Sequence, residues 1–340
     1  MSYPPSLAEL AVRSKRALII GVGGGGDVIQ SIPVGNYLRL LGVGEIIVGG
    51  VGSAWWMPEG DPVSRDPAVM TFGPTVYEVA ELAPSQEWTP GIVGVESASN
   101  HKGRRPAEAV LADLLPGTPF VAGLTRGVVG LRDALAALIA ARDIDLVVGV
   151  DIGSDSFHDG TEVVRAQTSL IDFMTIGALT QLEVPVVYAL AGYGADNEMR
   201  LEELDARVGR VMKAGGYLGA MGLSHRDVDE MLVACARYPD PIEHYAALAA
   251  RGEFGYRKVQ TATPWGHAVK ITPLAAVILF FDPRVMVQEC CRGVAALQGT
   301  RSLTEAEEIY ATVLGQIPET RLQPFIRFMR PADGAGETRP

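Results

Sequence analysis

Short apolar runs alternate with stretches of helical periodicity along most of the chain. Six of these runs are continuous, which is typical of strands buried on both faces: 17–21, 45–49, 91–95, 145–150, 185–191 and 277–281. Between them, apolar residues recur at helical spacing in two sets: Leu131, Leu135, Leu138 and Ile139, and Leu201, Leu204, Val208, Val211 and Met212. Ser224 and Thr304 are predicted N-caps, because each has an acid three residues further on.

This alternation predicts an α/β protein with a doubly wound, mainly parallel, Rossmann-like sheet and helices on both faces. We expect 17–21, 145–150 and 185–191 to be parallel neighbours in one sheet. Residues 1–330 are predicted to form a single α/β domain, and residues 331–340 a flexible C-terminal tail without apolar periodicity. In such sheets the ligand lies beyond the carboxyl ends of the strands, so functional residues are sought after each run.

Composition and charge argue against several classes of function. The net charge of −11 argues against a nucleic-acid partner, since such binders cluster cations on phosphates. The basic cluster Lys102, Arg104 and Arg105 is either a solvated loop or an arm that holds an anionic substrate group. No apolar run approaches the roughly 20 residues of a membrane span, and the N-terminus lacks the pattern of a signal peptide. We therefore expect a cytoplasmic protein without membrane association.

The three cysteines, Cys235, Cys290 and Cys291, form no CxxC pair. Their odd number and spacing predict neither a disulfide nor a thiolate zinc site.

The stretch "GVGGGGDVIQ", residues 21–30, follows the first apolar run. Its glycines at 21, 23 and 26 have the spacing of a dinucleotide-binding turn, but Asp27 would compete with phosphate for the same N–H donors. The acid that usually binds the ribose is missing, because the second run ends in Gly49-Gly50-Val51-Gly52. Pro33 also requires that the following helix starts late, with Ser31 as a candidate cap, or that it kinks. The loop is therefore expected to receive hydroxyls, an amine or a cation rather than pyrophosphate.

Two further loops combine glycine with carboxylates. "DIGSDSFHDGTE", residues 151–162, follows the run at 145–150, and "GYGADNEM", residues 192–199, follows the run at 185–191. If the sheet brings the three loops together, they form an acidic crevice in which carboxylates raise one another's pKa or bind a cation. The candidate catalytic residues are Asp27, Asp151 and Asp155. The candidate substrate-binding residues are Gly23, Gly24, Gly25, Gly26, His158, Glu162, Gly194, Asp196, Asn197 and Glu198.

Each of these residues also has a purely structural interpretation. Asp, Asn and Gly are common in turns, and Asp27 or Asp196 could cap a helix, with Asp196, Asn197 and Glu198 at the start of the helix near 201–212. His158 could be an exposed loop histidine. Trp55 and Trp56 could stack on a planar ligand, anchor a loop or lie in a subunit interface. Asp172, among apolar neighbours, faces either the crevice or a polar stripe of its helix.

The segments "GVGGGGDV", "GVDIGSDS" with its downstream glutamate, and "GYGADNE" resemble the family called domain of unknown function 1152, in this order and over most of the chain. The resemblance implies an α/β fold with a crevice lined by glycine and acids, and it implies no activity. The third segment departs from the family, which tends to have glycine where this chain has Asn197.

Two classes of function follow from these residues. The first is an enzyme that hydrolyses a C–N or glycosidic bond in a small polar metabolite such as a nucleoside, sugar or amino derivative, with one of Asp27, Asp151 or Asp155 activating water. Asp151 and Asp155 are candidate ligands for Mg²⁺ or Ca²⁺. The second is a small-molecule binding or sensor protein without chemistry, and the glycine spacing keeps an NAD-dependent oxidoreductase as a third alternative. Homo-oligomerisation stays open.

Overall fold

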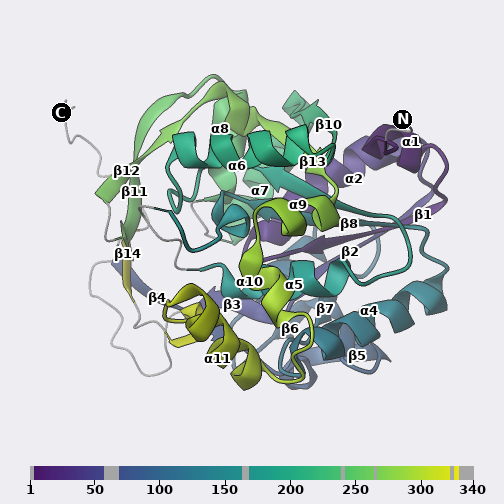
Figure 1. The fold of residues 1–340 in the computed structure, drawn as a ribbon. Helices are drawn as coiled ribbons and strands as arrows, with labels where there is room; N and C mark the ends of the chain where they lie inside the picture. Colours follow the sequence, from purple (N-terminus) through teal and green to yellow (C-terminus); the bar gives the residue numbers. More distant parts are fainter. Residues whose placement is uncertain are drawn as a thin grey trace.

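A nine-stranded mixed sheet forms the centre of the molecule (Figure 1). The computed structural model describes residues 4–56, 69–162, 168–238, 242–263, 266–321 and 325–328. Across the sheet the strands follow the order β10 (Tyr217–Gly222), β13 (Val277–Phe281), β9 (Val186–Ala191), β8 (Leu146–Ile152), β1 (Arg16–Gly21), β2 (Glu45–Val51), β7 (Phe120–Ala122), β6 (Ile92–Asn100) and β5 (Ala83–Thr89).

The five central strands, β9, β8, β1, β2 and β7, run parallel to one another. The predicted neighbours are confirmed, since β1 pairs with β8, and β8 pairs with β9. The outer strands β13, β10, β6 and β5 are antiparallel to their neighbours. Because β2 and β8 lie on opposite sides of β1, the chain reverses its winding direction there, and a crevice is expected at the carboxyl ends of β1 and β8.

Helices cover both faces of this sheet, as the alternation of strands and helices predicts. One hydrophobic core contains residues of α4 (Gly127–Arg142), α5 (Leu170–Leu179), α6 (Leu201–Lys213), α9 (Pro283–Glu289), α10 (Arg292–Leu297) and α11 (Leu303–Leu314). The other contains residues of α1 (Leu7–Ala11), α2 (Ser31–Leu40), α3 (Ala107–Leu111), α7 (His225–Arg237) and α8 (Glu243–Ala250). Strand β1 serves both cores, with Leu18 and Ile20 on one face and Ala17 and Ile19 on the other.

Short 3₁₀ helices connect several of these elements: η1 (Asp27–Gln30), η2 (Val79–Glu81), η3 (Asp155–Phe157), η4 (Pro273–Ala276) and η5 (Glu319–Arg321). Because η1 precedes it, α2 starts late, and Pro33 falls in its first turn, where a missing N–H removes no helical hydrogen bond. Ser31 is the first residue of α2 rather than its cap.

The predicted helix starts have mixed outcomes. Ser224 caps α7 and forms a capping box with Asp227, as predicted. The prediction for Thr304 was wrong, because the side chain of Ser302 accepts the hydrogen bond at the start of α11. The prediction that Asp196 to Glu198 begin a helix was also wrong, since α6 starts only at Leu201.

A second, five-stranded sheet was not predicted. It has the order β12 (Gly266–Ile271), β11 (Gly255–Thr263), β14 (Phe325–Phe328), β4 (Val69–Val76) and β3 (Ser53–Trp56). Trp55 and Trp56 belong to β3. The predictions for their side chains lie outside the described part of the structure. The predicted flexible tail at 331–340 also lies outside the described residues.

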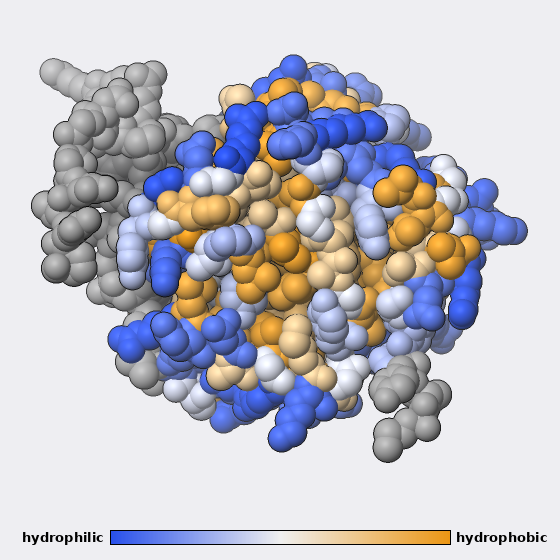
Figure 2. All heavy atoms as spheres, turned by 90° about the horizontal axis from the view of Figure 1, so that it is seen from above, coloured by the Kyte–Doolittle hydropathy of each residue, from blue (hydrophilic) through white to orange (hydrophobic). Residues whose placement is uncertain are grey.

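Seen from above, the surface carries apolar residues near its middle and many hydrophilic residues around them (Figure 2). Among the described residues, no helix combines the length and the apolar character that crossing a membrane requires.

Candidate functional site

Three buried aspartates converge at the carboxyl ends of β1 and β8. Asp27 comes from the turn after β1, Asp151 from the end of β8, and Asp172 from the first turn of α5. One carboxylate oxygen from each of them lies within 4.8 Å of the other two. The side chains come from opposite faces of the sheet, because α2 follows the turn containing η1 and α5 packs in the other core. The arrangement therefore occupies the predicted crevice.

The glycine-rich loop makes room for these carboxylates. A Cβ on Gly23 would lie 2.7 Å from an oxygen of Asp172 and 2.9 Å from one of Asp27, which is closer than real Cβ contacts come. The backbone N–H of Gly23 donates a hydrogen bond of 2.6 Å to Asp27 Oδ2. Gly24 and Gly25 have φ values of 81° and 59°, which favour glycine. The missing side chains of this loop thus admit protein carboxylates, and Asp27 takes an N–H that a phosphate would use.

Asp151 and Asp172 share one hydroxyl donor, that of Ser156. Ser156 Oγ donates to Asp151 Oδ2 at 2.5 Å and lies 3.3 Å from Asp172 Oδ1, and Tyr188 on β9 donates to Asp151 Oδ2 at 2.5 Å. Asp172 was the residue that periodicity could not orient. It lies 2 % exposed within the cluster, so it faces the crevice.

The other predicted acids lie around this cluster. Asp155 Oδ2 accepts from Thr168 Oγ1 at 3.2 Å, and the same hydroxyl donates to Glu198 at 2.5 Å. Asp155 is not one of the three residues whose oxygens converge. Ser154 donates to both oxygens of Asp196, from its hydroxyl at 2.8 and 2.9 Å and from its N–H at 2.9 Å.

Glycines admit two further acids in the same manner. A Cβ on Gly153, whose φ is 128°, would lie 2.5 Å from the carboxyl carbon of Asp196, and one on Gly26 would lie 2.2 Å from that of Glu243. Neither Glu243 nor this use of glycine was predicted, because the contacts join residues far apart in the chain.

Asn197 has a φ of 61° in the turn that also contains Gly194 at 68°. Asparagine and glycine are the residues that adopt this left-handed conformation most readily. The departure of Asn197 from the family pattern therefore preserves the backbone shape of the loop.

Burial raises the pKa values of the clustered aspartates. Burial, followed by the charges of Asp151, Glu243 and Asp155, raises the pKa of Asp27 well above its ordinary range. Burial and the neighbouring acids also raise the pKa of Asp172 and of Asp155. Burial raises the pKa of Asp151 against the opposing hydrogen bonds from Ser156 and Tyr188.

The pKa of Asp196, at the outside of this group, is also raised. Burial, followed by Glu198, raises the pKa of Asp196 to about 7. None of the ion pairs recorded between described residues includes Asp27, Asp151, Asp155, Asp172 or Asp196.

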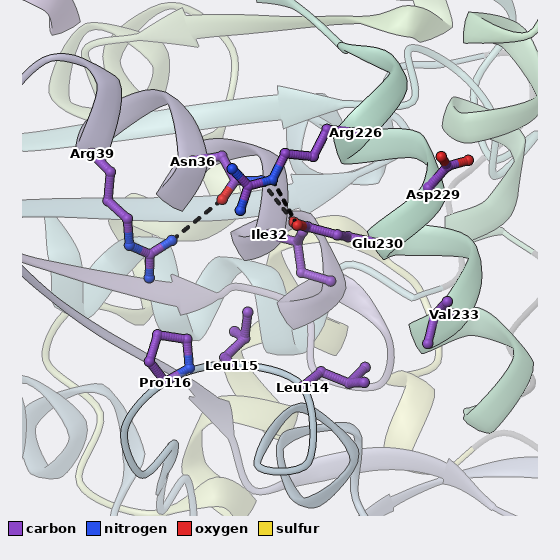
Figure 3. A pocket seen from close by; sticks show the side chains of 10 residues that line it. All are labelled: Ile32, Asn36, Arg39, Leu114, Leu115, Pro116, Arg226, Asp229, Glu230 and Val233. Atoms are coloured by element: carbon purple, nitrogen blue, oxygen red, sulfur yellow. Dashed lines mark hydrogen bonds and ion pairs between the residues drawn. The ribbon is translucent and has the colours of Figure 1, made fainter.

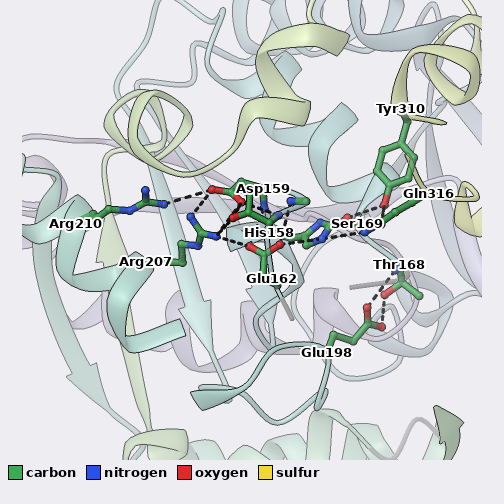
Figure 4. A network of polar contacts seen from close by, with 12 residues as sticks. His158, Asp159, Glu162, Thr168, Ser169, Glu198, Arg207, Arg210, Tyr310 and Gln316 are labelled. Atoms are coloured by element: carbon green, nitrogen blue, oxygen red, sulfur yellow. Dashed lines mark hydrogen bonds and ion pairs between the residues drawn. The ribbon is translucent and has the colours of Figure 1, made fainter. Parts of the chain in front are cut away.

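His158 and Glu162 belong to a separate network of paired charges (Figure 4). His158 is fully buried rather than exposed, with its Nε2 3.1 Å from Glu162 and 3.1 Å from Gln316 Nε2. Arg207 from α6 forms ion pairs with both Asp159 and Glu162, the latter at 2.8 Å. The cluster thus contains Asp27 and Asp151 of the predicted catalytic residues, together with Asp172. Asp155 lies beside it, whereas His158 and Glu162 belong to the arginine network.

A hollow of about 480 Å³ lies between α2, α7 and the segment after α3 (Figure 3). Its polar side chains contact one another: Arg226 binds Glu230 at 2.8 Å, and Asn36 Nδ2 donates to Glu230 at 2.8 Å. None of the converging aspartates lines it. The hollow is therefore distinct from the acidic cluster.

Comparison with known proteins bears out the family resemblance. Neither a curated protein nor a solved structure matches the chain. The family model described as "protein of unknown function (DUF1152)" matches residues 18–320, so the chain belongs to the DUF1152 family.

Proposed function

We propose that this protein is a hydrolase of a small polar metabolite and that it uses a divalent cation held by Asp27, Asp151 and Asp172. The observation that carries the proposal is the convergence of three buried carboxylates within 4.8 Å without an ion-pair partner in the described residues. Buried charges normally occur with a counter-charge or a metal. These acids therefore either keep protons or take up a cation.

The spacing and chemistry of the three oxygens suit a hard cation. Ca²⁺ binds carboxylate oxygens at about 2.3–2.6 Å, so two ligands on opposite sides of it lie roughly 4.6–5.2 Å apart. Three oxygens that all lie within 4.8 Å of one another are near enough to bind one such ion together, and Mg²⁺, with ligands at about 2.0–2.1 Å, would need them closer together than Ca²⁺ does. Ser156 would then orient Asp151 and Asp172, and Tyr188 would orient Asp151, from outside the coordination shell.

Asp155 is the best candidate for a general base within this group. Its side chain lies beside the cluster, where it accepts a hydrogen bond from Thr168, and burial together with the neighbouring acids raises its pKa above the ordinary range of a carboxyl group. Asp155 would take a proton from water, the water oxygen would bond to the substrate carbon, and the C–N or glycosidic bond would break with its electron pair on the leaving group. The cation would stabilise the negative charge that develops.

The geometry disfavours the NAD alternative. The space beside Gly23, where a dinucleotide's pyrophosphate would approach, faces carboxylate oxygens of Asp172 and Asp27. Phosphate and carboxylate repel each other, and the N–H of Gly23 already binds Asp27.

The test is cation titration after dialysis against a chelator, by calorimetry and by melting temperature. We expect Ca²⁺ or Mg²⁺ to raise the melting temperature of the wild type, and Asp27→Asn and Asp172→Asn to weaken cation affinity by about 100-fold, because each removes one charged ligand. Asp229→Asn, at an exposed acid in the hollow, is the matched control and should bind like the wild type.

Turnover is then screened with nucleosides and glycosides, with and without the cation. Cation-dependent release of base or sugar supports the proposal, and an Asp155→Asn variant should retain cation binding while losing turnover by about 10²-fold or more. No cation binding would refute the cation site. Cation and ligand binding without turnover would instead support the binding or sensor protein.

A further inference from the structure

Gln30 is a buried amide that the structure leaves without partners. It is the last residue of η1, and its side chain is 0 % exposed. Neither its Nε2 nor its Oε1 has a hydrogen-bond partner among the described residues. It occupies the N-cap position of α2, yet its side chain makes no capping hydrogen bond. Buried amides without partners are costly and rare, so this one points to a ligand or to an ordered water.

Gln30 shares the short helix η1 with Asp27 of the acidic cluster. A 3₁₀ helix has three residues per turn, so side chains at positions i and i+3 project from the same side. Asp27 and Gln30 have this spacing and are the first and last residues of η1. Asp27 faces Asp151 and Asp172, and this spacing therefore places Gln30 on the same side of η1 as Asp27.

We propose that Gln30 is a specificity-determining residue of this site and that it recognises an amide-like edge of the substrate. This inference rests on the proposed function. A glutamine amide has a donor and an acceptor side by side, and it pairs best with a group that presents the complementary pair, as a carboxamide or an amino-substituted nucleobase does. The surrounding carboxylates disfavour an anionic substrate, so the expected substrate is neutral or positively charged.

The functional and the structural role of Gln30 predict opposite results for Gln30→Met. This substitution keeps the length of the side chain and removes both polar atoms. If the amide is retained for a ligand, the ligand-free variant should melt at the same temperature as the wild type or higher, because no partner is lost. A structural role would instead lower the melting temperature and leave ligand affinity unchanged.

The experiment uses the full chain with Ca²⁺ or Mg²⁺ present and with adenosine, adenine and nicotinamide as probes, and with ribose as the probe that lacks an amide-like edge. We expect at least one amide-bearing probe to bind the wild type, and Gln30→Met to weaken that binding by at least 10-fold while cation affinity stays unchanged. Gln86→Met, at an exposed glutamine on β5, is the matched control and should bind the probe normally.

Two results would overturn the inference. One is equal probe affinity in the wild type and in Gln30→Met, and the other is a wild type that binds none of the three amide-bearing probes. Failure of the proposed function is recognised separately, because it appears as absent cation binding or absent turnover. Asp172→Asn, which should lose cation affinity, reports on that proposal, whereas Gln30→Met reports only on recognition of the amide.

Discussion

Two groups of buried acids in this protein differ in whether a positive side chain neutralises them. In the first, Asp27, Asp151 and Asp172 face one another, and burial raises their pKa values. In the second, Asp159 and Glu162 bind Arg207 (Figure 4). Burial also acts to raise the pKa of Asp159, but hydrogen bonds from Thr161 and the charge of Arg207 outweigh it, so that pKa is lowered.

The difference indicates what each group is for. The arginine network carries its counter-charge within the chain, so it is complete as folded and ties α6 to the loop after β8. The aspartate cluster has no counter-charge among the described residues and costs stability unless protons or a cation neutralise it. An uncompensated group that a fold retains is a candidate functional site.

The largest effect should come from breaking the compensated group. Arg207→Met removes the arginine that pairs with both acids, so Glu162 loses its arginine and Asp159 keeps only the partly exposed Arg210. We therefore expect the free energy of unfolding to fall by about 3–5 kcal/mol. Denaturant unfolding measures this change. Arg210→Met is the control, because Arg210 is 45 % exposed and 3.5 Å from Asp159, and it should cost less than about 1 kcal/mol. Equal losses in the two variants would contradict the comparison.

A smaller effect is expected from crowding the aspartate cluster. Gly23→Ala places a Cβ 2.7 Å from Asp172 and 2.9 Å from Asp27, so it should cost about 1–3 kcal/mol and weaken cation binding by shifting the ligands. Gly209→Ala in α6 has open space around its Cβ and should be neutral or stabilising by up to about 1 kcal/mol. Unfolding curves and a Ca²⁺ titration of both variants measure these effects. Unchanged cation affinity in Gly23→Ala would show that the glycine-rich loop is not part of the cation site.

The smallest effect is the change of stability with pH, and acids of the two groups should change it in opposite directions. Asp196 has an ordinary pKa of 3.8 and a folded pKa of about 7, so the folded state binds more protons in between. Its contribution to stability is therefore lost as the pH rises from about 4 to about 7. The lowered pKa of Asp159 acts oppositely, with stability lost only as the pH falls below about 4.

Between pH 5 and pH 7 we accordingly expect the free energy of unfolding of the cation-free protein to decrease by about 1–2 kcal/mol. Ca²⁺ should oppose this decrease, because it would replace the protons on Asp27, Asp151 and Asp172, whose pKa values are raised in the same direction as that of Asp196. Melting curves at several pH values, with chelator and with Ca²⁺, measure both effects. A stability that rises over this range without cation would show that the acids are compensated by other charges.

Much of the architecture follows from local patterns along the chain. Continuous apolar runs predicted β1, β2, β8 and β9 of the five central strands, because strands covered on both faces need apolar side chains at every position. The fifth central strand, β7, has only three residues and was not among the predicted runs. The capping box at Ser224 was found because its signal lies within four residues. The predicted cap at Thr304 was two residues too late, since Ser302 and Thr304 each have an acid three residues further on and only the backbone selects Ser302.

The partners within the site depend on contacts between distant residues. All ten residues of α5 are buried, so its apolar periodicity could not orient Asp172. His158 looked like a loop histidine because Gln316, its partner at 3.1 Å, lies 158 residues away. The second sheet likewise pairs strands from both ends of the chain, such as β4 with β14.

The sequence by itself thus predicted the buried strands and the turns with glycine and acids that follow them, since turn conformation and strand burial depend on residues close together in the chain. The order of β2, β1, β8 and β9 across the sheet decides that Asp27, Asp151 and Asp172 meet. It also decides that Arg207 neutralises Asp159 and Glu162 but not the three aspartates. Charge compensation acts over a few ångströms between residues far apart in the chain, and for that reason only the folded structure separates the two groups of acids.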